Sequence, residues 1–184
     1  VGQGVEAIVM NASGCGVTVK DYGHIFRHDP DYAEKARRIS ELTQDLSELL
    51  PSLVPLLLPK LQPQHAQQQG LLAFHPPCTL QHGQQLRGGV EQHLGALGFQ
   101  LQLAPVEAHL CCGSAGTYSV LQPGTATQLR DRKLGHLNAL EPQGVISANI
   151  GCITQIGLGT QIPIVHTVEL LDWAYGGPKP EALP

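Results

Sequence analysis

Two adjacent cysteines, Cys111 and Cys112, run directly into a glycine-rich turn, and this stretch constrains the fold more than any other in the chain. Neighbouring Cα atoms lie about 3.8 Å apart, whereas a relaxed disulfide spans roughly 4.4–6.8 Å, so the two thiols are poor partners for each other. The small residues at 113–116 let backbone N–H groups approach an anionic sulfur, which lowers the pKa of a thiol. The pattern favours two thiols that bind a third group. The alternative is a pair of buried structural cysteines.

Four short apolar segments in the second half of the chain predict buried strands, because turn residues bound each of them. These segments are 71–75, 99–104, 145–148 and 162–165. Leucines at helical spacing between the segments predict intervening helices. Strands that alternate with helices indicate an α/β fold, with a parallel sheet, flanking helices and the carboxyl ends of the strands at one edge.

A cysteine or a cysteine pair follows three of these predicted strands. The thiols concerned are Cys78, Cys111, Cys112 and Cys152. Ligands of parallel sheets collect at the carboxyl edge, so we expect the four sulfurs to converge in one pocket there. The four cysteines are therefore the candidate metal ligands.

The first part of the chain repeats this pattern imperfectly. Segment 8–15, which ends in Cys15, is similar to segment 145–152, which ends in Cys152. We interpret residues 1–50 as the C-terminal part of a first repeat, and Cys15 as the remnant of that repeat's site. Cys15 is then expected to lie apart from the other four thiols. The alternative is that Cys15 is an unrelated buried thiol.

Composition and local signals set the other boundaries. An Asp29-Pro30 start and apolar spacing predict one continuous helix over 33–50. Proline and glutamine are concentrated in residues 51–70, which predicts a connector. Residues 71–177 then form a complete second domain, and residues 178–184 form a tail.

Charge, hydropathy and cysteine count exclude several classes of protein. The 11 basic and 15 acidic residues give a net charge of −4, which argues against a nucleic-acid partner. No apolar run approaches the roughly 20 residues of a transmembrane helix. Five cysteines are an odd number, which favours a reducing compartment and metal or redox use over a disulfide framework. The start at Val1, close to a predicted strand, indicates a fragment of a longer protein.

With these cysteines in place, the chain resembles the cysteine-rich CCG domain family, found in B-type heterodisulfide reductase subunits and in lactate- and glycolate-oxidising iron–sulfur proteins. Segments 111–123 and 147–152 are most similar to the iron–sulfur subunits of glycolate oxidases, and segment 12–16 is similar to their first repeat. The resemblance implies an electron-transfer subunit that takes electrons from FAD in a partner subunit and passes them to a quinone-type acceptor. It also implies a cytoplasmic protein, either in solution or peripheral on the inner membrane.

The chain departs from the B-type reductase pattern after Cys152. That pattern ends in Cys-x-x-Cys and supplies five thiolates, whereas this chain has Gln155 at the last position. Four thiolates match the number that an ordinary [4Fe–4S] cluster needs. They also match tetrahedral zinc, although the two close cysteine pairs usual in zinc sites are lacking. The competing functional class is a zinc-bound or metal-free module that serves as a docking platform for partner subunits.

Three histidines near predicted strand ends are further candidates: His75, His109 and His166. Each is suited to a hydrogen bond to a thiolate or to proton transfer coupled to electron transfer, or is an ordinary polar residue. Nothing in the sequence resembles a flavin-binding fingerprint. We therefore expect no catalytic residues in this chain, and no glycolate oxidation by the chain alone.

Overall fold

The computed structural model describes residues 4–67 and 69–184, which form two parallel sheets with helices around them. The smaller sheet pairs β1 (Ile8–Met10) with β2 (Thr43–Asp45). The larger sheet has the order β4-β3-β5-β6, and its strands are β3 (Leu72–Phe74), β4 (Leu101–Leu103), β5 (Gly144–Ser147) and β6 (Ile164–His166). Every pairing in the two sheets is parallel, which confirms the α/β class.

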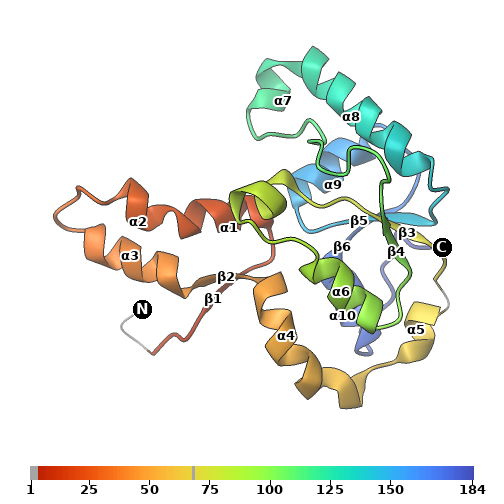
Figure 1. The fold of residues 1–184 in the computed structure, drawn as a ribbon, viewed down its shortest axis with the longest axis horizontal. Helices are drawn as coiled ribbons and strands as arrows, with labels where there is room; N and C mark the ends of the chain where they lie inside the picture. The colour runs from red at the N-terminus through yellow and green to blue at the C-terminus, as the bar shows by residue number, and fades with distance from the viewer. Residues whose placement is uncertain (1–3, 68) are drawn as a thin grey trace.

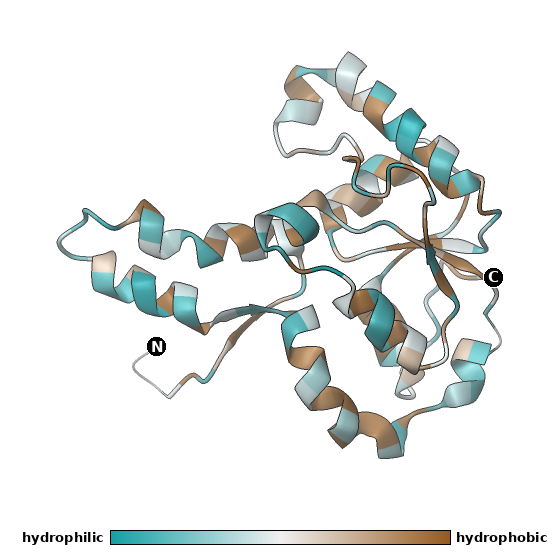
Figure 2. Ribbon diagram, in the orientation of Figure 1, coloured by the Kyte–Doolittle hydropathy of each residue, from teal (hydrophilic) through white to brown (hydrophobic). Residues whose placement is uncertain are grey.

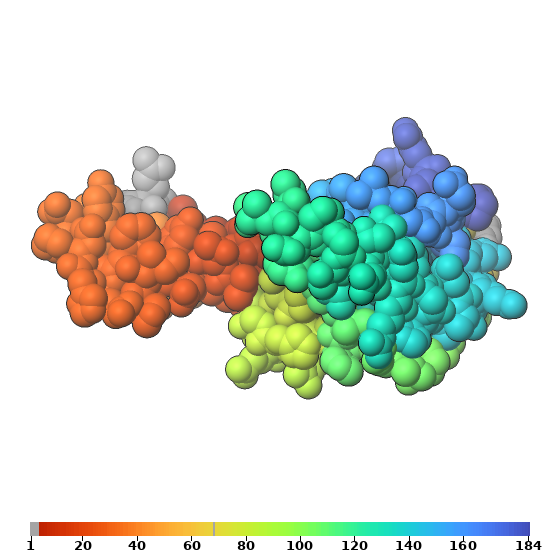
Figure 3. Space-filling view, turned by 90° about the horizontal axis from the view of Figure 1, so that it is seen from above, coloured from red at the N-terminus to blue at the C-terminus, as the bar shows by residue number. Residues whose placement is uncertain are grey.

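Helices accompany both sheets. Those beside the smaller sheet are α1 (Ser13–Lys20), α2 (Tyr22–Ile25) and α3 (Ala33–Leu42). Together with the smaller sheet they extend from one side of a larger body (Figures 1 and 3). The helical elements of that body are α4 (Leu46–Leu57), η1 (Leu58–Lys60), α5 (Pro63–Gln67), η2 (Thr79–Gly83), α6 (Gly89–Ala96), α7 (Tyr118–Leu121), α8 (Pro123–Asn138), α9 (Ile150–Gly157) and α10 (Thr167–Ala174). Within the described ranges, no helix has the length and apolar character needed to cross a membrane.

Both faces of the larger sheet are buried, because alternate residues of its strands supply two cores. Phe74 belongs to a core with Leu94 of α6 and with α10. Ala73 points the other way, into a core with Leu137 of α8 and Ile156 of α9. Figure 2 shows the consequence in part, since the central strands are largely hydrophobic while α8 mixes hydrophilic with hydrophobic residues.

The strand order places a topological switch point between β3 and β5. The chain leaves β3 toward β4 through α6, and it leaves β5 toward β6 through α9, which packs on the opposite face. Loops that diverge from neighbouring parallel strands leave a crevice at the carboxyl edge, and ligands bind there in sheets of this kind. The segments after β3 and β5 are those that carry Cys78 and Cys152.

The prediction of one continuous helix over 33–50 is wrong. Helix α3 ends at Leu42, and β2 follows it. Pairing with β1 supplies ladder hydrogen bonds to this segment and buries the Thr43 and Asp45 side chains, an arrangement that the local helical spacing does not reveal.

A capping box at Asp45 begins helix α4 directly after β2. The Asp45 carboxylate accepts a hydrogen bond from the Ser47 N–H at 3.0 Å, and the Glu48 carboxylate accepts one from the Asp45 N–H at 2.7 Å. Helix α4 then continues to Leu57, so part of the Pro/Gln-rich stretch at 51–70 is helical.

Candidate metal centre

Three segments bring four cysteines to the carboxyl edge of the larger sheet. Cys78 follows β3, the pair Cys111 and Cys112 lies between β4 and α7, and Cys152 lies in the first turn of α9 after β5. All four line one pocket of about 410 Å³. Cys112 and Cys152 are buried, whereas Cys78 and Cys111 are half-buried.

Two glycines allow the cysteine segments to approach each other. Gly113 has a φ of +87°, and a Cβ at this position would lie 2.2 Å from the carbonyl oxygen of Ala126 in α8. A Cβ at Gly151 would lie 2.9 Å from Oγ of Ser114. Gly113 is therefore needed both for its backbone conformation and for its contact with the α8 backbone, whereas a side chain at position 151 would require Ser114 to move.

The neighbouring thiols shift one another's pKa values in opposite directions. Hydrogen bonding first to Cys112 and then to Cys78 lowers the pKa of Cys111 to about 2. Hydrogen bonding to Cys112 lowers the pKa of Cys152 to about 5. The pKa values of Cys78 and Cys112 are raised, mainly by their hydrogen bonds to Cys111 and by burial. Metal ligands must be deprotonated, so a cation bound by these four cysteines would displace the protons that their thiols still carry.

N–H donors also point at the sulfurs. The Gly113 N–H donates to Cys111 Sγ at 3.3 Å, and Asn149 Nδ2 donates to Cys152 Sγ at 3.5 Å. Hydrogen bonds to cysteine sulfurs favour the anionic thiolate and raise the reduction potential of a cluster that the sulfurs hold.

His75 lies behind the thiols and is 1% exposed. Its ring nitrogen, Cys112 Sγ and Cys152 Sγ all lie within 4.8 Å of one another. Neither ring nitrogen of His75 makes a hydrogen bond of good geometry among the described residues, although the ring lies close enough to Cys152 to help lower the pKa of that thiol. A buried polar group without a partner costs about 1–3 kcal/mol, so its presence beside four thiols fits a site that binds a metal or a cluster.

The other two candidate histidines have different surroundings. His109 is exposed, and its carbonyl oxygen accepts a hydrogen bond from Gln81 Nε2 at 3.4 Å. His166 caps α10, where its Nδ1 accepts from the Val168 N–H at 3.1 Å, and burial lowers the pKa of its ring. His75 is thus the histidine of the three that the structure groups with cysteine sulfurs.

Cys15 also lines the 410 Å³ pocket, on its exposed side, although we expected this thiol to lie apart from the other four. Helix α1 is held there by contacts with the loops of the larger sheet. Ser13 Oγ lies 2.8 Å from Thr79 Oγ1, and the Gly14 N–H donates to Asn149 Oδ1 at 3.3 Å. The two segments that resemble each other in sequence, 8–15 and 145–152, therefore contact each other in space.

Lys133 of α8 is a buried charge that the sequence analysis missed. It is 1% exposed, and its Nζ donates to the carbonyl oxygens of Glu107 and Ala108 at 2.8 and 3.1 Å. Burial lowers the pKa of Lys133, and attraction to the Cys112 thiol opposes this effect. The ammonium group anchors the segment that leads to the cysteine pair and supplies positive charge beneath it. The sequence pattern that could have revealed this burial is the helical spacing of α8, since Lys133 comes seven residues after the buried Ala126 and so lies on the same face of the helix.

This geometry defines a cysteine-rich α/β protein. The family model described as "CCG: Cysteine-rich domain" matches residues 72–157, the region that contains all four clustered cysteines. The glycolate oxidase iron-sulfur subunit of Escherichia coli (strain K12) is 45% identical over 171 residues, which cover 93% of this chain and 40% of that protein.

Lactate utilization protein A of Geobacillus thermodenitrificans (strain NG80-2) is 31% identical over 175 residues, which cover 91% of this chain and 70% of that protein. A probable glycolate oxidase iron-sulfur subunit of Bacillus subtilis (strain 168) is 27% identical, and the match covers 39% of it. The chain belongs to the family of CCG cysteine-rich proteins that includes these relatives, which confirms the resemblance drawn from the cysteine motifs. It spans about 40% of the length of the two glycolate oxidase subunits.

Replacing Gly113 with alanine tests the close contact between the cysteine pair and α8. We expect Gly113→Ala to lower the free energy of unfolding by about 2–4 kcal/mol. Alanine is strained in the left-handed conformation of this position, and its Cβ would clash with the Ala126 backbone. Urea denaturation of the reduced, metal-free chain measures this change. The control is Gly135→Ala at an exposed position of α8. A Cβ there meets nothing within 4 Å, so alanine should stabilise the helix by about 0.5–1 kcal/mol. Equal effects of the two substitutions would contradict the assignment.

Proposed function

We propose that this chain is part of the iron–sulfur subunit of a glycolate or related 2-hydroxy-acid oxidase, in which it transfers electrons. The observation that carries the proposal is the convergence of four cysteines from three segments on one pocket. The relative that shares 45% identity is a glycolate oxidase iron-sulfur subunit, which supports the choice of oxidase.

In this proposal Cys78, Cys111, Cys112 and Cys152 hold a [4Fe–4S] cluster. Such a cluster, when bound, accepts and releases one electron at a time. The chain's own residues would set its properties. The Gly113 N–H and the Asn149 amide hydrogen-bond to ligand sulfurs, and Lys133 adds a buried positive charge, so all three favour the more negative, reduced state.

Partners and boundaries are part of the same proposal. Electrons would come from FAD in a partner subunit, where the 2-hydroxy acid is oxidised, and would pass to a quinone-type acceptor at the cytoplasmic side of the inner membrane. Residues 1–50 would be the end of a first CCG repeat, joined by 51–70 to a second domain at 71–177 with a tail at 178–184. Cys15 would then belong to the site of the first repeat.

A second candidate function is a zinc-bound or metal-free docking module. The observation that favours zinc is the buried set of His75, Cys112 and Cys152, whose ligand atoms lie within 4.8 Å of one another. Nitrogen and sulfur ligands of this kind suit tetrahedral zinc. The docking function would need no bound iron and no change of oxidation state.

Serine variants of the five cysteines test which thiols bind the metal. Each of the four substitutions Cys78→Ser, Cys111→Ser, Cys112→Ser and Cys152→Ser should remove most of the iron, because a [4Fe–4S] cluster needs all of its thiolate ligands. Iron analysis and visible absorbance after anaerobic reconstitution provide the measurement. Cys15→Ser is the matched control, since it lines the same pocket but should leave the iron content nearly unchanged. Similar iron loss from all five variants would contradict the assignment.

Removing the buried charge of Lys133 should make the reduction potential of the bound cluster more negative, by some tens of millivolts. Lys133→Gln is the variant of choice, because it removes the charge and keeps N–H donors for the carbonyl groups of Glu107 and Ala108. Arg132→Gln is the matched control on the same helix, because Arg132 is exposed and screened by solvent. A redox titration monitored by electron paramagnetic resonance measures both potentials. An unchanged potential in Lys133→Gln, with iron content intact, would contradict the role given to this residue.

A further inference from the structure

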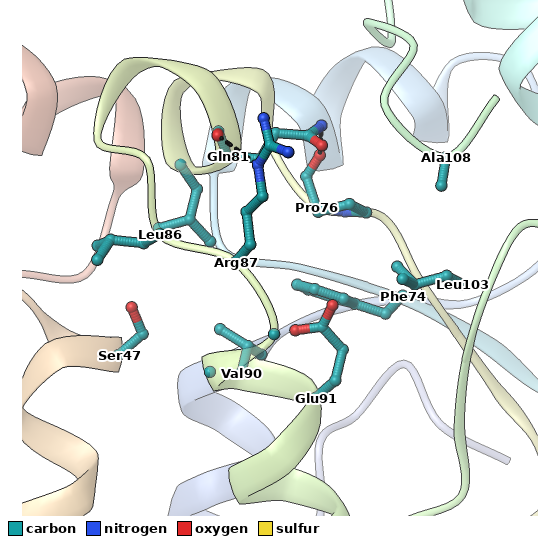
Figure 4. A pocket seen from close by; sticks show the side chains of 13 residues that line it. Ser47, Phe74, Pro76, Gln81, Leu86, Arg87, Val90, Glu91, Leu103 and Ala108 are labelled. Atoms are coloured by element: carbon teal, nitrogen blue, oxygen red, sulfur yellow. Dashed lines mark hydrogen bonds between the residues drawn. The ribbon is translucent and has the colours of Figure 1, made fainter.

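A second pocket lies beside the thiol pocket at the carboxyl edge of the larger sheet. Its volume is about 220 Å³, and Figure 4 shows the side chains that line it. The lining comes from the ends of β3 and β4, from η2 and α6, and from the start of α4. No part of the proposed metal site occupies this space, so the pocket is available to a separate ligand.

The walls of the second pocket are mainly apolar. Its apolar lining residues are Phe74, Pro76, Leu80, Leu86, Val90, Leu103 and Ala108. Pockets for drug-sized ligands have volumes of roughly 300–1,000 Å³, so 220 Å³ suits one small ring system and is too small for a flavin nucleotide. Open space surrounds the turn at Gly88 and Gly89, since a Cβ at Gly88 would meet nothing within 4 Å and one at Gly89 would meet only the Ser47 carbonyl oxygen, at 3.9 Å.

Two ionisable side chains also line the pocket, the exposed Arg87 and the half-buried Glu91. Figure 4 shows Arg87 extending toward Gln81, to whose carbonyl oxygen its Nε donates at 3.1 Å. The Glu91 carboxyl lies beside Phe74, and burial raises its pKa. Arg87 Nη2 also lies 3.4 Å from His82 Nδ1, and the remaining N–H groups of the guanidinium can donate to an oxygen acceptor. The Glu91 carboxyl can exchange a proton with a ligand oxygen. A small carboxylate ligand is disfavoured, because it would leave the apolar walls unfilled and would meet Glu91.

Only a thin wall separates this pocket from the thiols. Pro76 lines the second pocket, and Cys78, two residues later, lines the thiol pocket. Thr79 and Leu80 are consecutive in η2. Leu80 lines the second pocket, whereas Thr79 lines the thiol pocket. Gln81 braces the wall, since its Nε2 donates to the Pro76 carbonyl at 3.1 Å. A ligand in the second pocket would therefore lie next to the proposed electron-transfer centre.

We propose that the second pocket binds the ring of a quinone, which receives electrons from the thiol-bound centre. The inference rests on the proposed function, and it assigns that function's acceptor to particular residues. The flat ring fits between the walls formed by Phe74, Val90 and Leu103. Its two oxygens take hydrogen bonds from Arg87 and from the carboxyl group of Glu91.

The reductant is the partner subunit's flavin of the proposed function, which would re-reduce the centre after each of its two one-electron transfers. The quinone gains two electrons, which arrive one at a time from the centre, and two protons, and it leaves as the hydroquinone. Glu91 donates one proton to a ring oxygen and regains it from water at the exposed Arg87 side of the pocket. The second proton reaches the other oxygen from water at the same opening.

Binding of ubiquinone-1 to the purified chain tests this inference directly. Leu103→Trp should weaken binding by about tenfold or more, because Leu103 lines the pocket, is 37% exposed, and leaves room for an indole to enter the space. Val120→Trp is the matched control, since Val120 is 78% exposed on α7 and does not line the pocket. Isothermal titration calorimetry measures both affinities. Equal binding by both variants, or no binding by the unmodified chain, would overturn the inference.

Two further measurements separate the ligand classes and the two proposals. Arg87→Gln and Glu91→Gln should each weaken ubiquinone-1 binding, whereas glycolate in excess should not compete; competition by glycolate would identify a carboxylate site and overturn the quinone assignment. Iron content is measured on the same samples. Leu103→Trp with full iron and weak quinone binding supports the inference. Full iron without any quinone binding refutes the inference alone, whereas absence of iron refutes the proposed function.

Discussion

Four cysteines gathered in one pocket at the edge of the larger sheet are the constraint on which the rest of this structure depends. Contacts between neighbouring thiols raise the pKa values of Cys78 and Cys112 and lower those of Cys111 and Cys152, and four thiolates in one pocket would repel one another. Neighbouring N–H groups and a lysine reduce the free-energy cost of the negative charge that remains on the sulfurs. N–H donors point at two sulfurs, and a buried lysine lies beneath the cysteine pair. A metal centre would replace the shared protons and relieve the repulsion altogether.

The parallel sheet explains how residues distant in the chain reach this arrangement. Strands β3 and β5 are neighbours, and the chain leaves them in opposite directions, which opens the crevice that Cys78 and Cys152 flank. The larger sheet and its crevice were predictable from the sequence, because apolar strands, helical spacing and the position of each cysteine after a strand all agreed. The topology of a parallel sheet brings these thiols together even though they are far apart in the sequence and form no short metal-binding motif.

Other features were not predictable because they depend on contacts between distant segments. The strand β2 forms within an apparently helical stretch, since its partner β1 lies more than 30 residues away. Cys15 was expected to lie apart, but the hydrogen bond from the Gly14 N–H to Asn149 holds α1 against the thiol pocket. Lys133 resembles a surface lysine until the segment that carries the cysteine pair folds over it. In each case a tertiary contact outweighs the local pattern.

Iron and acid-labile sulfide analysis of the anaerobically reconstituted chain tests the central claim most directly. Coordination of one [4Fe–4S] cluster by Cys78, Cys111, Cys112 and Cys152 predicts about four iron atoms and about four sulfides per chain, with little zinc. A single bound zinc, or iron without sulfide, would contradict the cluster and favour the docking module instead.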